Sequence, residues 1–142
     1  MRLLLSFLLC ALAGCDLVGE DVDTYAGLIT VALVEDATVE NAAVRLTAVD
    51  DPGCARTLVT AFDRGAATRT VEVLGLAPVG GASCDAVIPA VALVPLDLGP
   101  ELPGGFLIEI EHAGAVDQYS LDVTTRALTL TAVRTSTTRL AE

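Results

Sequence analysis

Residues 106–132 read FLIEIEHAGAVDQYSLDVTTRALTLTA and decide the fold class of this chain. Apolar and polar side chains alternate in three runs, at 106–111, 119–124 and 128–132. A period of two places apolar residues on one face of a β-strand and polar residues on the other. The links between the runs are short. The segment therefore predicts a three-stranded antiparallel meander with one face in solvent.

The preceding part of the chain holds shorter runs of the same kind, separated by turn residues. Runs rich in Val, Thr and Leu are expected to form strands at 25–34, 43–49, 54–62, 69–74 and 84–96. The last run contains Pro89 and Pro95, and proline donates no ladder hydrogen bond, which predicts an edge strand or two short strands. Loops are expected at 50–53, 75–83 and 99–104. No run after the first fourteen residues has a sustained helical period.

This spacing predicts one all-β domain, a single antiparallel β-sandwich of about eight strands that is immunoglobulin-like in a loose sense. We expect a helical, cleaved leader at 1–14, an acidic tether at 15–23, the sandwich at 24–134 and a polar tail at 135–142.

The leader has the features of an export signal. Arg2 precedes an apolar run at 3–12, which is about the length of a signal h-region and too short to span a bilayer. Leu12, Ala13, Gly14 and Cys15 then match the lipobox, so the precursor resembles a bacterial lipoprotein. The resemblance implies cleavage before Cys15, acylation of Cys15 and anchoring of the domain to an extracytoplasmic membrane surface. It also implies that Asp16 favours inner-membrane retention, although the sorting rule differs between bacteria. An ordinary secretory signal is the alternative.

Composition limits the classes of partner. The chain has a formal net charge of −11 and contains neither lysine nor tryptophan. Such a charge disfavours nucleic acid and anionic lipid headgroups. Removal of the leader leaves about 128 of the 142 residues, enough for one domain with a real core.

The cysteines differ in their expected use. Cys10 lies in the discarded leader, and the resemblance assigns Cys15 to the lipid. Cys54 and Cys84 remain, and an oxidising compartment then allows one intramolecular disulfide between them. Two free buried thiols are the alternative.

Few residues suggest catalysis or metal binding. His112 is the single histidine and is expected to be an exposed turn residue. A hydrolase would need His112 beside Ser83, Ser120 or Ser136, none of which has a nucleophile-elbow context. Glu109 and Glu111 share a strand face and are expected in solvent. Calcium is the one metal worth weighing, with ligands from acidic turns that match no EF-hand spacing. These turns contain Glu20, Asp21, Asp23, Glu35, Asp36, Asp50 and Asp51.

The sequence thus favours a non-catalytic, lipid-anchored protein of the cell envelope, without a cofactor, that acts as a structural or protein-interaction module. The alternative is an extracytoplasmic module that binds calcium or a small ligand.

Overall fold

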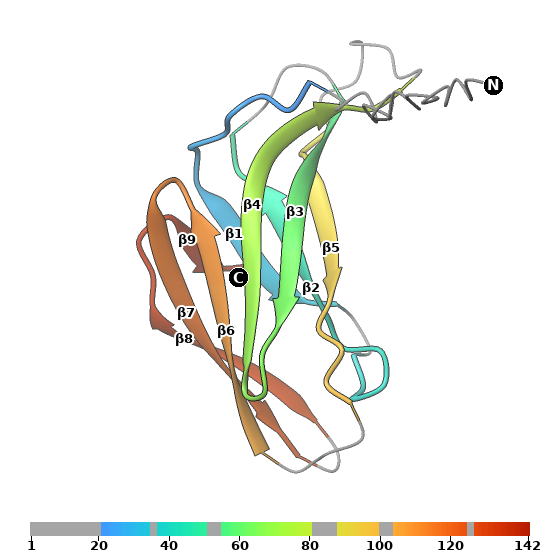
Figure 1. Cartoon of the computed structure of the whole chain (residues 1–142), viewed down its shortest axis with the longest axis vertical. Helices are drawn as coiled ribbons and strands as arrows, with labels where there is room; N and C mark the ends of the chain where they lie inside the picture. Colours follow the sequence, from blue (N-terminus) through green and yellow to red (C-terminus); the bar gives the residue numbers. More distant parts are fainter. Residues whose placement is uncertain (1–20, 35–36, 51–54, 81–87, 100–103, 125–126) are drawn as a thin grey trace, which may run out of the picture.

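The computed structural model of the chain describes residues 21–34, 37–50, 55–80, 88–99, 104–124 and 127–142. These residues form nine β-strands in two sheets packed as a sandwich (Figure 1). The strands are β1 (Ile29–Leu33), β2 (Ala43–Ala48), β3 (Arg56–Arg64), β4 (Thr68–Pro78), β5 (Val91–Pro95), β6 (Gly104–His112), β7 (Ala115–Val123), β8 (Leu128–Arg134) and β9 (Thr138–Leu140). The expected all-β sandwich is confirmed, with nine strands instead of about eight.

The four-stranded sheet has the order β5-β2-β1-β9, and the five-stranded sheet has the order β3-β4-β6-β7-β8. The strand β5, which follows Pro89 and ends at Pro95, lies at a sheet edge as predicted. The meander predicted from 106–132 is confirmed as β6, β7 and β8, which pair antiparallel in sequence order.

The core lies between the two sheets and follows the alternation in the sequence. Val44, Leu46 and Ala48 point inward from β2, as expected. The meander contributes alternate residues from β6 and β7, which are all buried: Phe106, Ile108, Ile110, Tyr119, Leu121 and Val123. Burying side chains of this size stabilises the folded state by about 1.5–3 kcal/mol each.

The prediction of a purely antiparallel sandwich is wrong for two pairs of strands. β4 pairs with β6 in parallel, and β1 pairs with β9 in parallel. In both cases the chain changes sheet before the second strand forms, so the partner is not the neighbour in sequence. A parallel pair requires a crossover of this kind, because a tight hairpin joins only antiparallel strands.

The expected polar tail at 135–142 is also wrong, because Thr138–Leu140 forms β9 beside β1. Thr138 is only 2% exposed. The expected loop at 75–83 is wrong for its first residues, since β4 continues to Pro78. A β-bulge interrupts the β3–β4 pairing between Val59 and Thr60, where β4 has one extra residue, Leu74.

The expected tether is bonded to the sandwich at its last residue, Asp23. The backbone of Asp23 exchanges two hydrogen bonds with Leu76, each 2.8 Å long, and its carboxylate pairs with Arg56. Gly75 has a φ of 146° and no side chain, which lets the backbone of Asp23 pass close beside it. The chain therefore enters the sandwich at the end where β4 finishes (Figure 1). No helix in the described ranges is long and apolar enough to cross a membrane.

Candidate functional site

Asp117, at the start of β7, is a fully buried carboxylate with an unusual number of donors. Its Oδ1 accepts hydrogen bonds from Ser136 N and Oγ, both at 2.8 Å. Its Oδ2 accepts hydrogen bonds from Thr137 N at 2.9 Å and Oγ1 at 3.0 Å, and from Thr138 N at 2.6 Å and Oγ1 at 2.7 Å. The hydroxyl of Tyr119 also lies 2.5 Å from Thr138 Oγ1.

These contacts make Asp117 a structural group. Burial disfavours its charged form, but hydrogen bonds from Thr138, Ser136 and Thr137 outweigh burial and lower its pKa from 3.8 to about 2. A carboxylate with all its lone pairs engaged is a poor proton acceptor. What it does is hold the crossover between β8 and β9.

His112 is not the exposed turn residue that the sequence suggested. It ends β6 and is 2% exposed, because the turn itself consists only of Ala113 and Gly114. Its Nε2 lies 2.8 Å from Gly27 O, so Nε2 carries the proton and donates. Its ring stacks on Tyr25, with 5.7 Å between the ring centroids. Its Nδ1 is buried without a hydrogen-bond partner in the described part of the chain.

The hydrolase arrangement is not assembled in the described residues. Ser120 alternates with the buried residues of β7 and faces away from the core, whereas His112 faces the core from β6. Ser136 bonds Asp117 and not His112. Ser83 lies outside the described residues.

Arg69, near the start of β4, is a third buried polar group, and no sequence motif marks it. It is 1% exposed. Its Nε donates to Leu96 O at 2.8 Å, and its two terminal nitrogens donate to Gly65 O at 2.6 Å and to Asp97 O at 3.1 Å. Its guanidinium also lies 4.7 Å from the centroid of the Phe106 ring.

These three residues act alike, and we call them the inter-sheet ties. Arg69, His112 and Asp117 all belong to strands of the five-stranded sheet. Their partners lie where the chain leaves or enters the four-stranded sheet: just after β5, just before β1 and at the start of β9. Buried polar groups must be hydrogen-bonded, and here they satisfy backbone groups that sit outside the main ladders.

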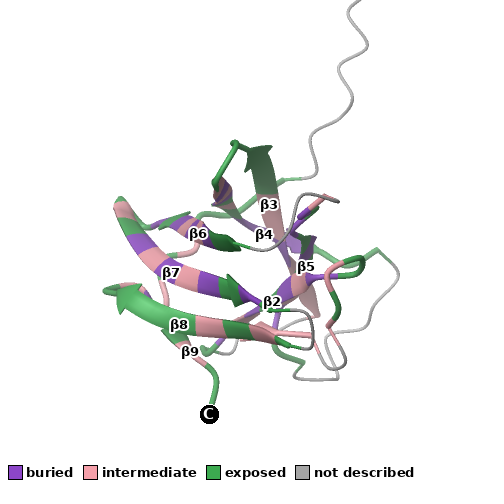
Figure 2. Ribbon diagram, turned by 90° about the horizontal axis from the view of Figure 1, so that it is seen from below, coloured by how far each residue is buried: buried purple, intermediate pink, exposed green. Residues whose placement is uncertain are grey.

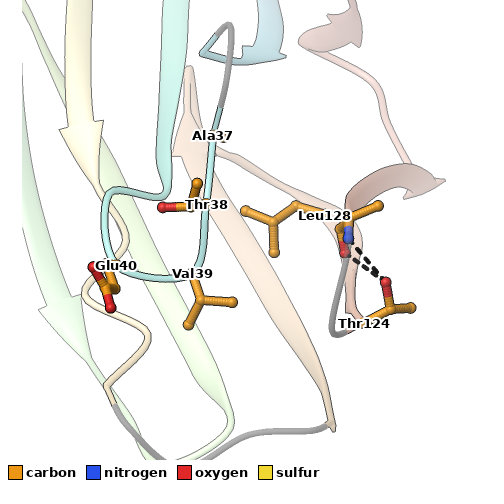
Figure 3. Close-up of a pocket in the computed structure, with 7 residues that line it drawn as sticks. Ala37, Thr38, Val39, Glu40, Thr124 and Leu128 are labelled. Carbon is orange, nitrogen blue, oxygen red and sulfur yellow. Dashed lines mark hydrogen bonds between the residues drawn. The ribbon is translucent and has the colours of Figure 1, made fainter.

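An open pocket of about 400 Å³ lies beside the residues that join β7 to β8. Figure 3 shows it between the segment before β2 and the turn between β7 and β8. Val39 and Leu128 face it from opposite sides, and Glu40 is the charged residue among the described residues that line it. Thr124, on its rim, bonds Ala127 through its hydroxyl. Ala37, Thr38 and Ala127 also belong to the described lining.

The carboxylates expected in solvent are found on the outer face of the five-stranded sheet. Glu111 is exposed, while Glu109 is half-buried and accepts a hydrogen bond of 2.8 Å from Gln118. Glu72 on β4 lies opposite Glu111 in the parallel register. Within the described ranges, no group of three acidic, histidine or cysteine residues is arranged to hold a metal ion.

Several predicted site residues lie outside the described residues. They are the lipobox residues 12–15, the disulfide candidates Cys54 and Cys84, and the acidic turn residues Glu20, Glu35, Asp36 and Asp51. The lipid anchor, the disulfide and a calcium site therefore stay predictions.

Comparison with known proteins adds no relative. No protein-family model matches the chain, and no curated protein or solved structure matches it either.

Proposed function

We propose that this chain is a non-catalytic, lipid-anchored protein of the cell envelope whose β-sandwich acts as a protein-interaction or structural module. The observation that carries the proposal is the lipobox Leu12-Ala13-Gly14-Cys15, directly after a short apolar run. Acylation at Cys15 would fix the domain to a membrane surface through more than one acyl chain, as stable anchoring requires.

The way in which the chain enters the domain supports this proposal. The backbone of Asp23 is bonded to Leu76, so a tether from Cys15 has a fixed attachment point at one end of the sandwich. Residues 16–22 can span at most about 25 Å, which holds the domain close to the membrane. The buried polar groups support a structural role, because Arg69, His112 and Asp117 direct their hydrogen bonds at backbone and hydroxyl groups of the scaffold.

A cysteine replacement tests the proposal, and the leader supplies a matched control. Cys15→Ala should abolish acylation, so the protein should become unprocessed or soluble. Cys10→Ala, in the discarded run, should leave both processing and membrane partition unchanged. Membrane fractionation and the mass of the mature N-terminus would be measured together. A Cys15→Ala protein that is cleaved and partitions like wild type would refute the anchor.

The second candidate is a module for a small ligand, and the pocket of about 400 Å³ favours it. Known small-molecule sites occupy roughly 300–1,000 Å³ and combine apolar walls with few polar groups. A thermal-shift screen of calcium and small organic cations would test it, with Val39→Trp to fill the pocket. A compound that raises the Tm of wild type but not of Val39→Trp would support this candidate. A calcium-dependent rise removed by Asp50→Asn would point to the acidic turns instead.

A further inference from the structure

β8 is an edge strand that is open along its length. It pairs with β7 on one side, and no described strand pairs with its other side. Figure 2 shows it at the rim of the five-stranded sheet, exposed over most of its residues. Val133 is 60% exposed, and Leu128 and Leu130 are only partly buried. An unpaired edge of this length is a template for another strand.

The other sheet edges in the described part of the chain are short, partly covered or charged: β3 is covered by β5 in its first half, and its exposed second half ends in Asp63 and Arg64. β3 and β5, the edges on one side of the sandwich, lie against each other, and Thr57 Oγ1 on β3 donates to Val91 O on β5 at 3.0 Å. β5 also ends in Pro95, which donates no hydrogen bond. β9, the remaining edge, is only three residues long. β8 has seven residues, no proline and no acidic side chain.

Charge points to the kind of strand that can approach. The chain carries a net charge of −11, so two copies repel over most of their surface. Residues 123–141 contain no Asp or Glu and include Arg126, Arg134 and Arg139. β8 lies within this acid-free stretch, which is therefore where a second acidic copy meets the least repulsion.

We propose that β8 pairs antiparallel with β8 of a second copy of this chain, joining the two five-stranded sheets. This inference rests on the proposed function as a protein-interaction module, and it identifies the interaction partner as a second copy of this chain. The hydrogen bond from Thr124 N to Ala127 O, 3.0 Å long, sets the phase of the β7–β8 ladder. In an antiparallel ladder such pairs alternate, so the backbone groups of Leu128, Leu130 and Ala132 point away from β7.

Thr131 is the centre of β8, and a two-fold axis through Thr131 pairs the greatest length of strand. Leu130 of each copy then lies opposite Ala132 of the other, and each such pair exchanges both of its backbone hydrogen bonds. The two Thr131 side chains form the closer, non-hydrogen-bonded pair on the axis. The pairing also covers the partly exposed Leu128 and Leu130.

The outer faces of the two copies are complementary in charge at this register. Arg134 is exposed and pairs in its own sheet with Gln118, on the solvent face. The β-bulge beside Gln118 shifts Arg134 by one position, which brings it opposite Thr129 of the second copy. Thr129 is paired with Asp122, whose carboxylate is exposed on the same face. In the single chain Arg134 donates to Val116 O of its own β7 at 3.5 Å, and in the dimer its guanidinium would turn from this carbonyl toward Asp122 of the other copy.

The anchors are compatible with this geometry. Antiparallel pairing turns one copy end for end, so the two Asp23 residues lie at opposite ends of the joined sheet. A dimer on one membrane then has its strands along the membrane plane, and residues 16–22 reach it within about 25 Å.

Cysteine crosslinking of the full chain in native membranes tests the register. Thr131→Cys should crosslink to itself on mild oxidation, since its Cβ atoms lie about 4.5–5.5 Å apart in such a pair. Thr129→Cys, on the same strand and face, lies about 14 Å from its counterpart, at 3.4 Å per residue, and should give at least ten-fold less dimer. Wild type and Leu93→Cys, at an exposed position of β5, report the background. Equal crosslinking at positions 129 and 131, or none at 131, would overturn the proposal.

A charge swap tests the partner contact in the same assay. Arg134→Asp and Asp122→Arg should each reduce the Thr131→Cys dimer several-fold, and the double swap should restore it. Single variants that leave the dimer unchanged would overturn the predicted register.

Sedimentation of the detergent-solubilised protein gives an answer that needs no added cysteine. Wild type should be a dimer, and Ala132→Pro should be a monomer that keeps its fold, because Ala132 is exposed and its lost N–H points away from β7. A wild-type monomer at every concentration would refute self-pairing. Retained membrane partition in that case would leave the lipid-anchored function standing.

Discussion

Replacing Asp117 with Asn should destabilise the fold more than any other single charge removal on β7. The change keeps the shape of the side chain but removes its charge and one acceptor oxygen. The amide NH₂ group, itself a donor, then faces the donors of Ser136 if it replaces Oδ1, or those of Thr137 and Thr138 if it replaces Oδ2. An unsatisfied buried donor costs about 1–3 kcal/mol. The side chain is fully buried, so water cannot compensate for the loss.

The pKa of Asp117 sets the size and the pH dependence of the effect. Its value of about 2 lies below the ordinary 3.8, so the unfolded state binds this proton more readily. The charged form therefore contributes about 2 kcal/mol of stability at pH 7. This contribution is complete above the unfolded value and is lost as the pH falls through the folded value, so that little of it remains at pH 2. We expect Asp117→Asn to lose about 3 kcal/mol in total at pH 7.

Urea unfolding of wild type and Asp117→Asn at pH 7 and pH 2 measures both the loss of stability and its dependence on pH. The difference in unfolding free energy should shrink by about 2 kcal/mol at the lower pH, because only wild type loses the charge. Asp122→Asn, on the exposed face of the same strand, is the control and should stay within about 0.5 kcal/mol of wild type. A gap below about 0.5 kcal/mol at pH 7, or one independent of pH, would refute this account of Asp117.

Three further outcomes can be measured with the same unfolding assay and a thiol assay. Arg69→Lys should cost about 3 kcal/mol, because one ammonium cannot reach all the carbonyl groups that the guanidinium bonds. A loss below about 1 kcal/mol would contradict this. His112→Phe should keep the stacking on the Tyr25 ring and lower the unfolding free energy by about 1 kcal/mol, because the carbonyl of Gly27 loses its donor. A variant more stable than wild type would show that the cost of burying the unpaired Nδ1 exceeds the gain from the bond to Gly27. Cys54 and Cys84 should show no free thiol under denaturing, non-reducing conditions, and their disulfide should contribute about 3.5 kcal/mol; two labelled thiols would contradict it.

The sequence predicted the parts of the fold that depend on alternation within one strand. The meander and the inward faces of β2, β6 and β7 follow directly from a period of two, because each strand has one wet face. The parallel pairs could not be found in this way. Pairing between β4 and β6, or β1 and β9, depends on where the chain crosses between sheets, and local pattern carries no signal for it. β9 was missed because its three residues include Thr138 and Arg139, which look polar out of context.

The inter-sheet ties did leave a signal in the sequence. His112 is in phase with Ile108 and Ile110, and Asp117 is in phase with Tyr119 and Leu121. Each is a polar residue at a core position near a strand end. Reading His112 as a turn residue ignored this phase, and the presence of Gly114 so close by explains the error. What the sequence could not supply is the partner, because the acceptors and donors lie far along the chain.

The ties should also differ in how they couple to neighbouring polar groups. Tyr119 and Asp117 both contact the hydroxyl of Thr138, which lies 2.5 Å from the Tyr119 hydroxyl and 2.7 Å from Asp117 Oδ2. Arg69 shares no described partner with either residue. The double variant of Tyr119→Phe with Asp117→Asn should therefore deviate from additivity by at least about 0.5 kcal/mol, since both changes act on the same hydroxyl. Arg69→Lys with Asp117→Asn should instead add within about 0.5 kcal/mol, because β6 separates their strands and no group is shared. The opposite pattern would mean that the two sheets are held by one cooperative polar network and not by separate local anchors.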